Sequence, residues 1–139
     1  MLVLTDTDPA ISSEDFLQFE EILGKKLPEA MMDFYLKHNG GQPQVRGVHD
    51  EHHLFPFNSF DSLEEMRKSL TWYDDEAVPA GFRATDLLHF AYDPGSGNYA
   101  LSLREEDYGK VYFYVLEETA ELYGQWPSFE FFLNSFVEE

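Results

Sequence analysis

The sequence predicts an α+β fold, in which an antiparallel β-sheet of at least three consecutive strands in the C-terminal half is flanked by helices. Residues 88–92 and 99–103 both alternate large apolar residues with smaller or polar ones. They flank residues 93–97, whose sequence DPGSG is typical of a tight turn, so the pair predicts a hairpin. After a second turn at 105–109, the β-branched and aromatic run 111–116 predicts a third strand.

Two helices are expected in the N-terminal third. The first begins at Ser12 or Ser13, which can cap a helix, and ends at Gly24. The second begins at Pro28, a residue suited to a first helical turn, and ends at the Asn-Gly-Gly run 39–41. Their apolar stripes have helical spacing and consist of Phe16, Phe19 and Leu23 in the first helix and Met31, Phe34, Tyr35 and His38 in the second.

A third helix is expected from Asp61 or Ser62 to about residues 74–76, and a last one opens near 126–128. Between the second and third helices the helical period breaks, and only residues 54–57 are apolar enough for a short strand. The stripes of the two helices are Leu63, Met66, Leu70 and Tyr73, and Phe129, Phe132, Leu133 and Phe136.

Length and composition predict that residues 1–139 form a single domain. A chain of 139 residues can bury about two thirds of the surface that it exposes when unfolded. Hydrophobic residues make up 43% and aromatic residues 17% of the chain, well above the content of disordered acidic segments.

The charge of the chain limits its partners. Nine Lys and Arg stand against 27 Asp and Glu, a net charge of -18. This charge repels nucleic acid and anionic lipid and attracts cationic partners, so direct binding of DNA or RNA is not expected. The alternative reading of the charge is that it serves solubility alone.

Cysteine is absent from the sequence, which excludes disulfides, thiolate nucleophiles and cysteine-based zinc sites. The first eight residues lack the basic start and apolar stretch of a signal peptide, and no run of about 18 apolar residues could span a membrane. We therefore expect a cytoplasmic protein that does not enter a membrane.

Several segments resemble the SUKH superfamily of Smi/Knr-like domains, in their order and in their residues. The resemblance covers nearly the whole chain, and most of the matching residues have architectural roles such as starting a helix or closing a turn. The segments are 19–29 (FEEILGKKLPE), 33–41 (DFYLKHNGG), 88–93 (LHFAYD), 97–101 (GNYAL), 109–112 (GKVY) and 128–133 (SFEFFL).

This resemblance implies a function as well as a fold. Bacterial members of the superfamily are widely regarded as immunity proteins that bind and neutralise polymorphic toxins, many of them nucleases, whereas eukaryotic relatives look like regulatory or scaffold proteins. A fold shared with a family does not by itself fix an activity. Immunity by occlusion of a basic toxin, regulatory protein binding without a toxin, and metal-dependent chemistry therefore all remain open.

Histidines 49, 52 and 53, with Asp50 and Glu51 between them, are the densest group of possible metal ligands. A metal site needs ligands that converge from fixed elements, whereas neighbouring residues of one loop point in different directions. We therefore expect a solvated loop, no bound metal and no cofactor.

No catalytic machinery is visible in the sequence, so we expect no enzyme. The glycine-rich turn 95–97 lacks the Lys-Ser/Thr ending of a phosphate loop and precedes a strand. No serine lies in a nucleophile elbow.

The candidate partner-binding surface combines two acidic triplets with neighbouring aromatic residues. Consecutive carboxylates on a helix or strand diverge, so neither triplet alone can aim its charges at one point as a catalytic site would. Together, however, they would make one acidic patch with aromatic anchors for a basic toxin. The surface consists of Trp72, Tyr73, Asp74, Asp75, Glu76, Glu105, Glu106, Asp107 and Tyr108.

Overall fold

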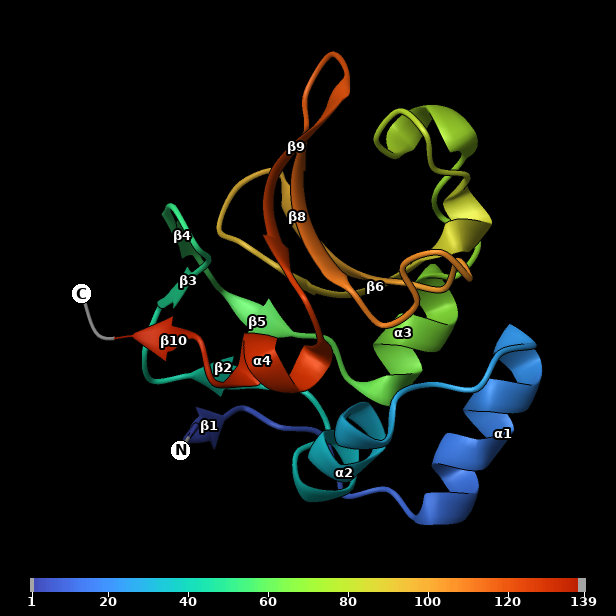
Figure 1. The fold of residues 1–139 in the computed structure, drawn as a ribbon. Coiled ribbons are helices and arrows are strands. Elements are labelled where there is room, and N and C mark those ends of the chain that lie inside the picture. Colours follow the sequence, from blue (N-terminus) through green and yellow to red (C-terminus); the bar gives the residue numbers. More distant parts are fainter. Residues whose placement is uncertain (1, 138–139) are drawn as a thin grey trace.

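A five-stranded antiparallel sheet forms the centre of the fold in a computed structural model, which describes residues 2–137 (Figure 1). Its strand order is β5-β6-β7-β8-β9, so each strand pairs with its neighbour in sequence. The strands are β5 (Ser59–Phe60), β6 (Leu87–Tyr92), β7 (Gly97–Ser102), β8 (Val111–Leu116) and β9 (Ala120–Trp126), and the helices are α1 (Ser13–Leu23), α2 (Glu29–Lys37), α3 (Leu63–Ser69) and α4 (Phe129–Leu133).

Short strands and two 3₁₀ helices complete the described chain. One small sheet pairs β1 with β2, and another has the order β10-β3-β4. These elements are β1 (Leu4–Thr5), β2 (Gln42–Pro43), β3 (Gly47–His49), β4 (Leu54–Pro56), β10 (Phe136–Val137) and the 3₁₀ helices η1 (Asp75–Ala77) and η2 (Ala84–Asp86).

The predicted three-stranded core of the sheet is confirmed, and so is the α+β class. Asp93 closes the first hairpin because its Oδ1 accepts hydrogen bonds from the backbone N–H groups of Gly95 and Gly97, at 2.8 and 2.7 Å. In the second hairpin Tyr99 lies opposite Phe113, as the antiparallel expectation requires. The two outer strands of this sheet, β5 and β9, were not predicted from the sequence.

Three of the predicted helices occur near their expected positions. Ser12 caps α1, since its Oγ accepts a bond from the Asp15 N–H while the Asp15 carboxylate accepts one from the Ser12 N–H. Gly24 ends α1 with φ 75°, a conformation that favours glycine. Pro28 lies immediately before α2, and α4 is shorter than expected because Phe136 belongs to β10.

The third helix is shorter than predicted. It begins after Ser62, but it ends at Ser69 rather than near residues 74–76. The Ser69 hydroxyl bonds back to the Met66 carbonyl, and the Asp74 carboxylate accepts bonds from two N–H groups of η1. Such local side-chain bonds to the backbone compete with the helical pattern, which explains the early end.

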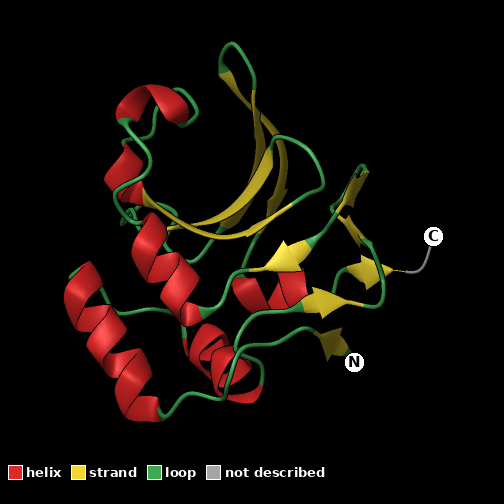
Figure 2. Cartoon of the chain, turned by 180° about the vertical axis from the view of Figure 1, so that it is seen from behind, coloured by secondary structure: helices red, strands yellow, loops and turns green. Residues whose placement is uncertain are grey.

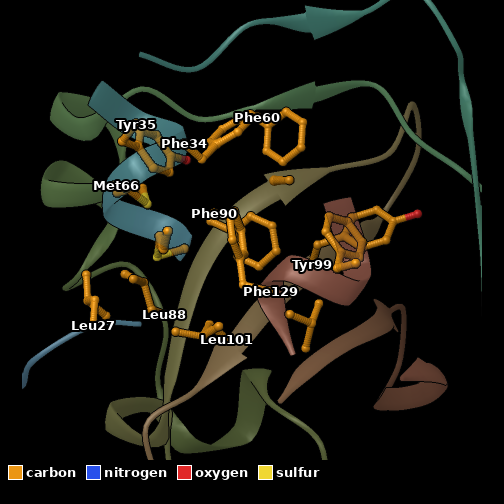
Figure 3. Close-up of a cluster of buried hydrophobic side chains, with 14 of the residues drawn as sticks. Leu27, Phe34, Tyr35, Phe60, Met66, Leu88, Phe90, Tyr99, Leu101 and Phe129 are labelled. Atoms are coloured by element: carbon orange, nitrogen blue, oxygen red, sulfur yellow. The ribbon is translucent and has the colours of Figure 1, made fainter. Parts of the chain in front are cut away.

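The convex face of the sheet carries the main hydrophobic core (Figure 3). Side chains of consecutive strand residues point to opposite faces, so Tyr99 and Leu101 lie in this core, whereas Ala100 lies on the other side. Aromatic rings from the helices fill it. Phe34 of α2 packs on Phe60 with ring centroids 4.7 Å apart, and many further aromatic contacts connect α4 to the sheet.

The concave face is covered by the segment of residues 70–86, which connects α3 to β6. A smaller apolar cluster joins Val78 and Phe82 of that segment to Tyr112 and Tyr114 of β8. Register shifts in the β6–β7 and β8–β9 pairs accompany the strong curvature of the sheet. Both ribbon views show the 70–86 segment and the tip of the β8–β9 hairpin rising on opposite sides of the concave face (Figures 1 and 2).

Candidate functional site

A hollow of about 670 Å³ opens on the concave face, between α3, the turn that follows it and the β6–β7 hairpin. Two parts of the chain that are distant in sequence build it, residues 61–73 and residues 89–98, together with Leu116 of β8. The side chains that define its chemistry are Asp61, Glu65, Lys68, Trp72, Tyr73 and His89.

The base of the hollow is a rigid aromatic stack. The rings of Tyr73 and His89 lie almost parallel, 9° apart in plane, with their centroids at 3.7 Å. Nε2 of His89 and the Tyr114 hydroxyl are 2.7 Å apart and share a hydrogen bond. Burial lowers the pKa of His89 to about 3, so the imidazole is neutral at physiological pH. His89 thus contributes shape and not charge.

Trp72 stands at the mouth of the hollow with 71% of its surface exposed. The other tryptophan, Trp126, is fully buried, and its indole Nε1–H donates to the His49 carbonyl at 2.9 Å. An indole left in water gains no burial energy, and exposed tryptophans are enriched among residues that anchor protein partners. Trp72 is therefore the strongest anchor candidate on this face.

Asp61 places a carboxylate in the same hollow, and its backbone is held firmly. The Asp61 N–H donates to the Phe90 carbonyl at 2.7 Å, and its own carbonyl accepts from the Tyr35 hydroxyl at 2.8 Å. Within residues 2–137, by contrast, its carboxylate accepts no hydrogen bond. Burial and the nearby Glu65 charge raise the pKa of Asp61 to about 7.

The first acidic triplet follows directly after Trp72 and Tyr73, which line this hollow. Asp74 caps η1, and an oxygen of the Asp75 carboxylate accepts the Ala84 N–H at 2.8 Å, while Glu76 is exposed. All three carboxyl groups belong to exposed residues, so their charge is directed to solvent. The chain thus presents residues 72–76 as one short segment of aromatic and acidic side chains.

The second predicted group, residues 105–108, lies elsewhere. Glu105 and Tyr108 line a separate hollow of about 600 Å³ beside Lys25 and Lys26, and the Tyr108 hydroxyl donates to the Lys26 carbonyl. Glu106 is exposed on the same turn. The Arg104 Nη1 donates to the Gly81 carbonyl at 3.1 Å, which ties this turn to the 70–86 segment.

Asp107 has a structural role in this turn. Its carboxylate accepts hydrogen bonds from the Arg104 guanidinium, the Ser102 hydroxyl and the Tyr112 hydroxyl. Burial alone would raise its pKa, but these bonds and the Arg104 charge hold the pKa of Asp107 well below its usual range. Asp107 therefore fixes the shape of the turn, whereas Glu105, Glu106 and Tyr108 form its outer surface.

The His49–His53 loop does not gather ligands around one point. The Asp50 carboxylate turns inward and accepts the N–H groups of His52 and His53 at 2.9 and 2.8 Å. Among residues 2–137, no group of three or more His, Asp or Glu side chains is arranged to hold a metal ion. The same residues include no helix with the length and apolarity that crossing a membrane requires.

Sequence reasoning missed Asp61, Glu65 and His89 as members of the site. Asp61 was predicted only as a possible start of the third helix, and Glu65 was not singled out. His89 offered a signal, because it interrupts the apolar strand sequence LLHFAY, and a polar side chain in such a strand must find a partner.

The fold and the site define an α+β domain with a hollow on its concave face that is lined by aromatic and acidic side chains. The model of the SMI1 / KNR4 family (SUKH-1) matches residues 10–135, nearly the whole chain. The chain belongs to this family, and the predicted membership is confirmed. A comparison with curated proteins gave no match.

Proposed function

We propose that this chain is an immunity protein that binds and neutralises a cognate polymorphic toxin. Family membership supports the proposal, since bacterial SUKH domains are widely regarded as toxin-immunity proteins. The observation that carries it is the concave face, where the exposed Trp72 indole lies next to carboxylates in a hollow large enough for a partner's side chains. Enzymatic chemistry has no comparable support.

The proposed mechanism is occlusion of a basic toxin, such as a nuclease domain. The net charge of -18 attracts a cationic protein from beyond contact distance. Residues 74–76 and the acidic tip of the β8–β9 hairpin, residues 117–121, are placed on opposite sides of the concave face (Figure 1). An acidic rim around an aromatic anchor resembles the polyanion that a nuclease binds, so the complex would cover the toxin's active site.

In this proposal the surface is centred on Trp72 and Tyr73 and extends over residues 74–76. The turn that carries Glu105, Glu106 and Tyr108 contributes from the flank, since Arg104 anchors it to the 70–86 segment. Asp107 contributes through the shape of that turn. A cytoplasmic location follows from the role, because the toxin must be neutralised before it reaches its target in the cell that makes it.

Co-expression tests the role directly. The candidate toxin is sought in the neighbouring upstream gene, as the variable basic C-terminal domain of a large secreted protein. Cells that express this domain alone should stop growing, and co-expression of the chain should restore growth and yield a stable 1:1 complex. A toxin domain from an unrelated locus serves as the control. If the neighbouring domain is neither bound nor neutralised, the immunity role is wrong, and a regulatory protein-binding domain becomes the better reading.

A further inference from the structure

The hollow beside Trp72 contains two carboxylates, and neither forms an ion pair with a cation of the described chain. Asp61 and Glu65 both line it, and Lys68 lines it as well. The ion pairs within residues 2–137, however, involve other residues, so Lys68 approaches neither carboxylate within 4 Å. An aromatic hollow with an unneutralised carboxylate is suited to a planar organic cation.

We propose that this hollow is a subsite for one arginine side chain of the protein partner. Asp61 and Glu65 serve as counter-ions, and the exposed indole of Trp72 packs against the guanidinium beside the Tyr73–His89 stack. This deepens the proposed function, because it names the partner group that the concave face recognises. Arginine fits better than lysine, since its guanidinium is planar, stacks on aromatic rings and donates two parallel hydrogen bonds to a carboxylate.

The two carboxylates have free acceptor positions. Glu65 uses Oε1 to accept the Ser62 N–H at 2.8 Å, which fixes its side chain in a capping box and leaves Oε2 for a ligand. The Asp61 carboxylate accepts no hydrogen bond from any described residue. Both acids lie at the start of α3 and their backbones are held by the fold, so the subsite is preorganised.

The groups that face Asp61 favour a cationic ligand. Glu65 and Lys68 come from α3, Tyr73 from the following turn, and His89 and Tyr92 from β6. Tyr35 of α2 donates its hydroxyl to the Asp61 carbonyl and carries no charge at neutral pH, since burial and then the Asp61 charge raise its pKa. Burial and then the Glu65 charge raise the pKa of Asp61, and burial followed by the Asp61 charge raises the pKa of Tyr73. His89 is neutral, so it does not oppose a cation.

Ionisation of Asp61 should therefore be coupled to arginine binding. A bound guanidinium stabilises the carboxylate, and so it binds the ionised form more tightly than the protonated one. Because the pKa of Asp61 is about 7 in the free protein, affinity should rise about tenfold between pH 6 and pH 8.

The probe is N-acetyl-arginine amide, titrated at constant ionic strength into the ¹⁵N-labelled full chain, with the two indole N–H signals as reporters. The Trp72 signal should shift, while the signal of the buried Trp126 should not. The citrulline analogue keeps the shape without the charge and should give less than a tenth of the shift, and the lysine analogue should bind more weakly. Asp61→Asn should abolish binding, whereas Glu21→Gln, an exposed acid on α1, should not change it.

Thermal unfolding separates loss of charge from loss of fold. A carboxyl whose pKa rises from 3.8 unfolded to about 7 folded stabilises the protein in its protonated form, so its contribution is lost as pH increases from 4 to 7. Asp61→Asn should therefore melt several degrees higher than the unchanged protein at pH 8, with a smaller difference at pH 4. A folded, more stable variant that no longer binds the probe supports the subsite.

The proposal is overturned if the arginine and citrulline probes shift Trp72 equally, or if Asp61→Asn binds the arginine probe as well as the unchanged chain. These measurements need no toxin. If the probe binds as expected but no neighbouring toxin is neutralised, the subsite stands and the immunity role falls. If the toxin is neutralised but the probe does not bind, the role stands and the subsite falls.

Discussion

Replacing Trp72 with Ala should raise the dissociation rate of the toxin complex at least 30-fold and leave the association rate within a factor of about three. This corresponds to a loss of about 2 kcal/mol, the size typical of an aromatic anchor at the centre of an interface. The indole is 71% exposed in the free protein, so its removal should not unfold the chain. Surface plasmon resonance with the immobilised toxin domain measures both rates.

Phe131→Ala is the matched control for this variant. Phe131 is also a large aromatic residue, 55% exposed, but it lies on α4 and lines a different hollow beside the His49–Glu51 loop. Its replacement should leave both rates within a factor of about three. If Phe131→Ala releases the toxin faster than Trp72→Ala does, the binding surface lies near α4 and not on the concave face.

Neutralising residues 74–76 of the acidic rim should lower the association rate of the toxin complex and leave its dissociation rate nearly unchanged. The combined variant Asp74→Asn, Asp75→Asn, Glu76→Gln should lower the association rate about tenfold at low salt, because fewer charges attract the toxin. Asn keeps the acceptor oxygens that cap η1 and bind the Ala84 N–H, so the segment should retain its shape. Stopped-flow fluorescence at several salt concentrations measures the effect.

The salt dependence tests whether the charges of residues 74–76 speed association by long-range attraction. Screening shortens the reach of the field to about 10 Å at 0.1 M salt, so the difference in association rate should shrink as salt is added, while dissociation changes little. The control replaces three exposed acids on the helical side, Glu14, Glu21 and Glu29, with Gln and makes the same change in net charge. If both triple variants slow association equally, net charge and not the rim governs the encounter.

The sequence was sufficient for most of the fold because its main signals are local. The turn at residues 93–97 and the alternation on either side of it determine the hairpin that the structure shows. β9 was missed because its burial does not alternate, with exposed residues at three consecutive positions from Glu121 to Tyr123. β5 was missed because two residues are too few to give a periodic pattern.

The candidate site could be predicted only in part, since it depends on contacts between distant segments. Trp72, Tyr73 and the acidic residues after them were found because aromatic and charged residues adjoin in the sequence. The sequence could not show that Asp61 shares their hollow with His89, because that requires the crossing from α3 to β6. Nor could it show that Asp107 is held by Arg104 and not free at the surface.

Hydrogen–deuterium exchange of the complex tests the central claim most directly, since it locates the bound toxin on the chain without any substitution. Binding should slow exchange in residues 69–76 and at the β8–β9 tip, residues 117–121, both of which border the concave face. Residues 129–137, which carry α4 and β10 on the other side of the sheet, should exchange as in the free protein. Protection confined to residues 129–137, with the concave face unchanged, would contradict the account.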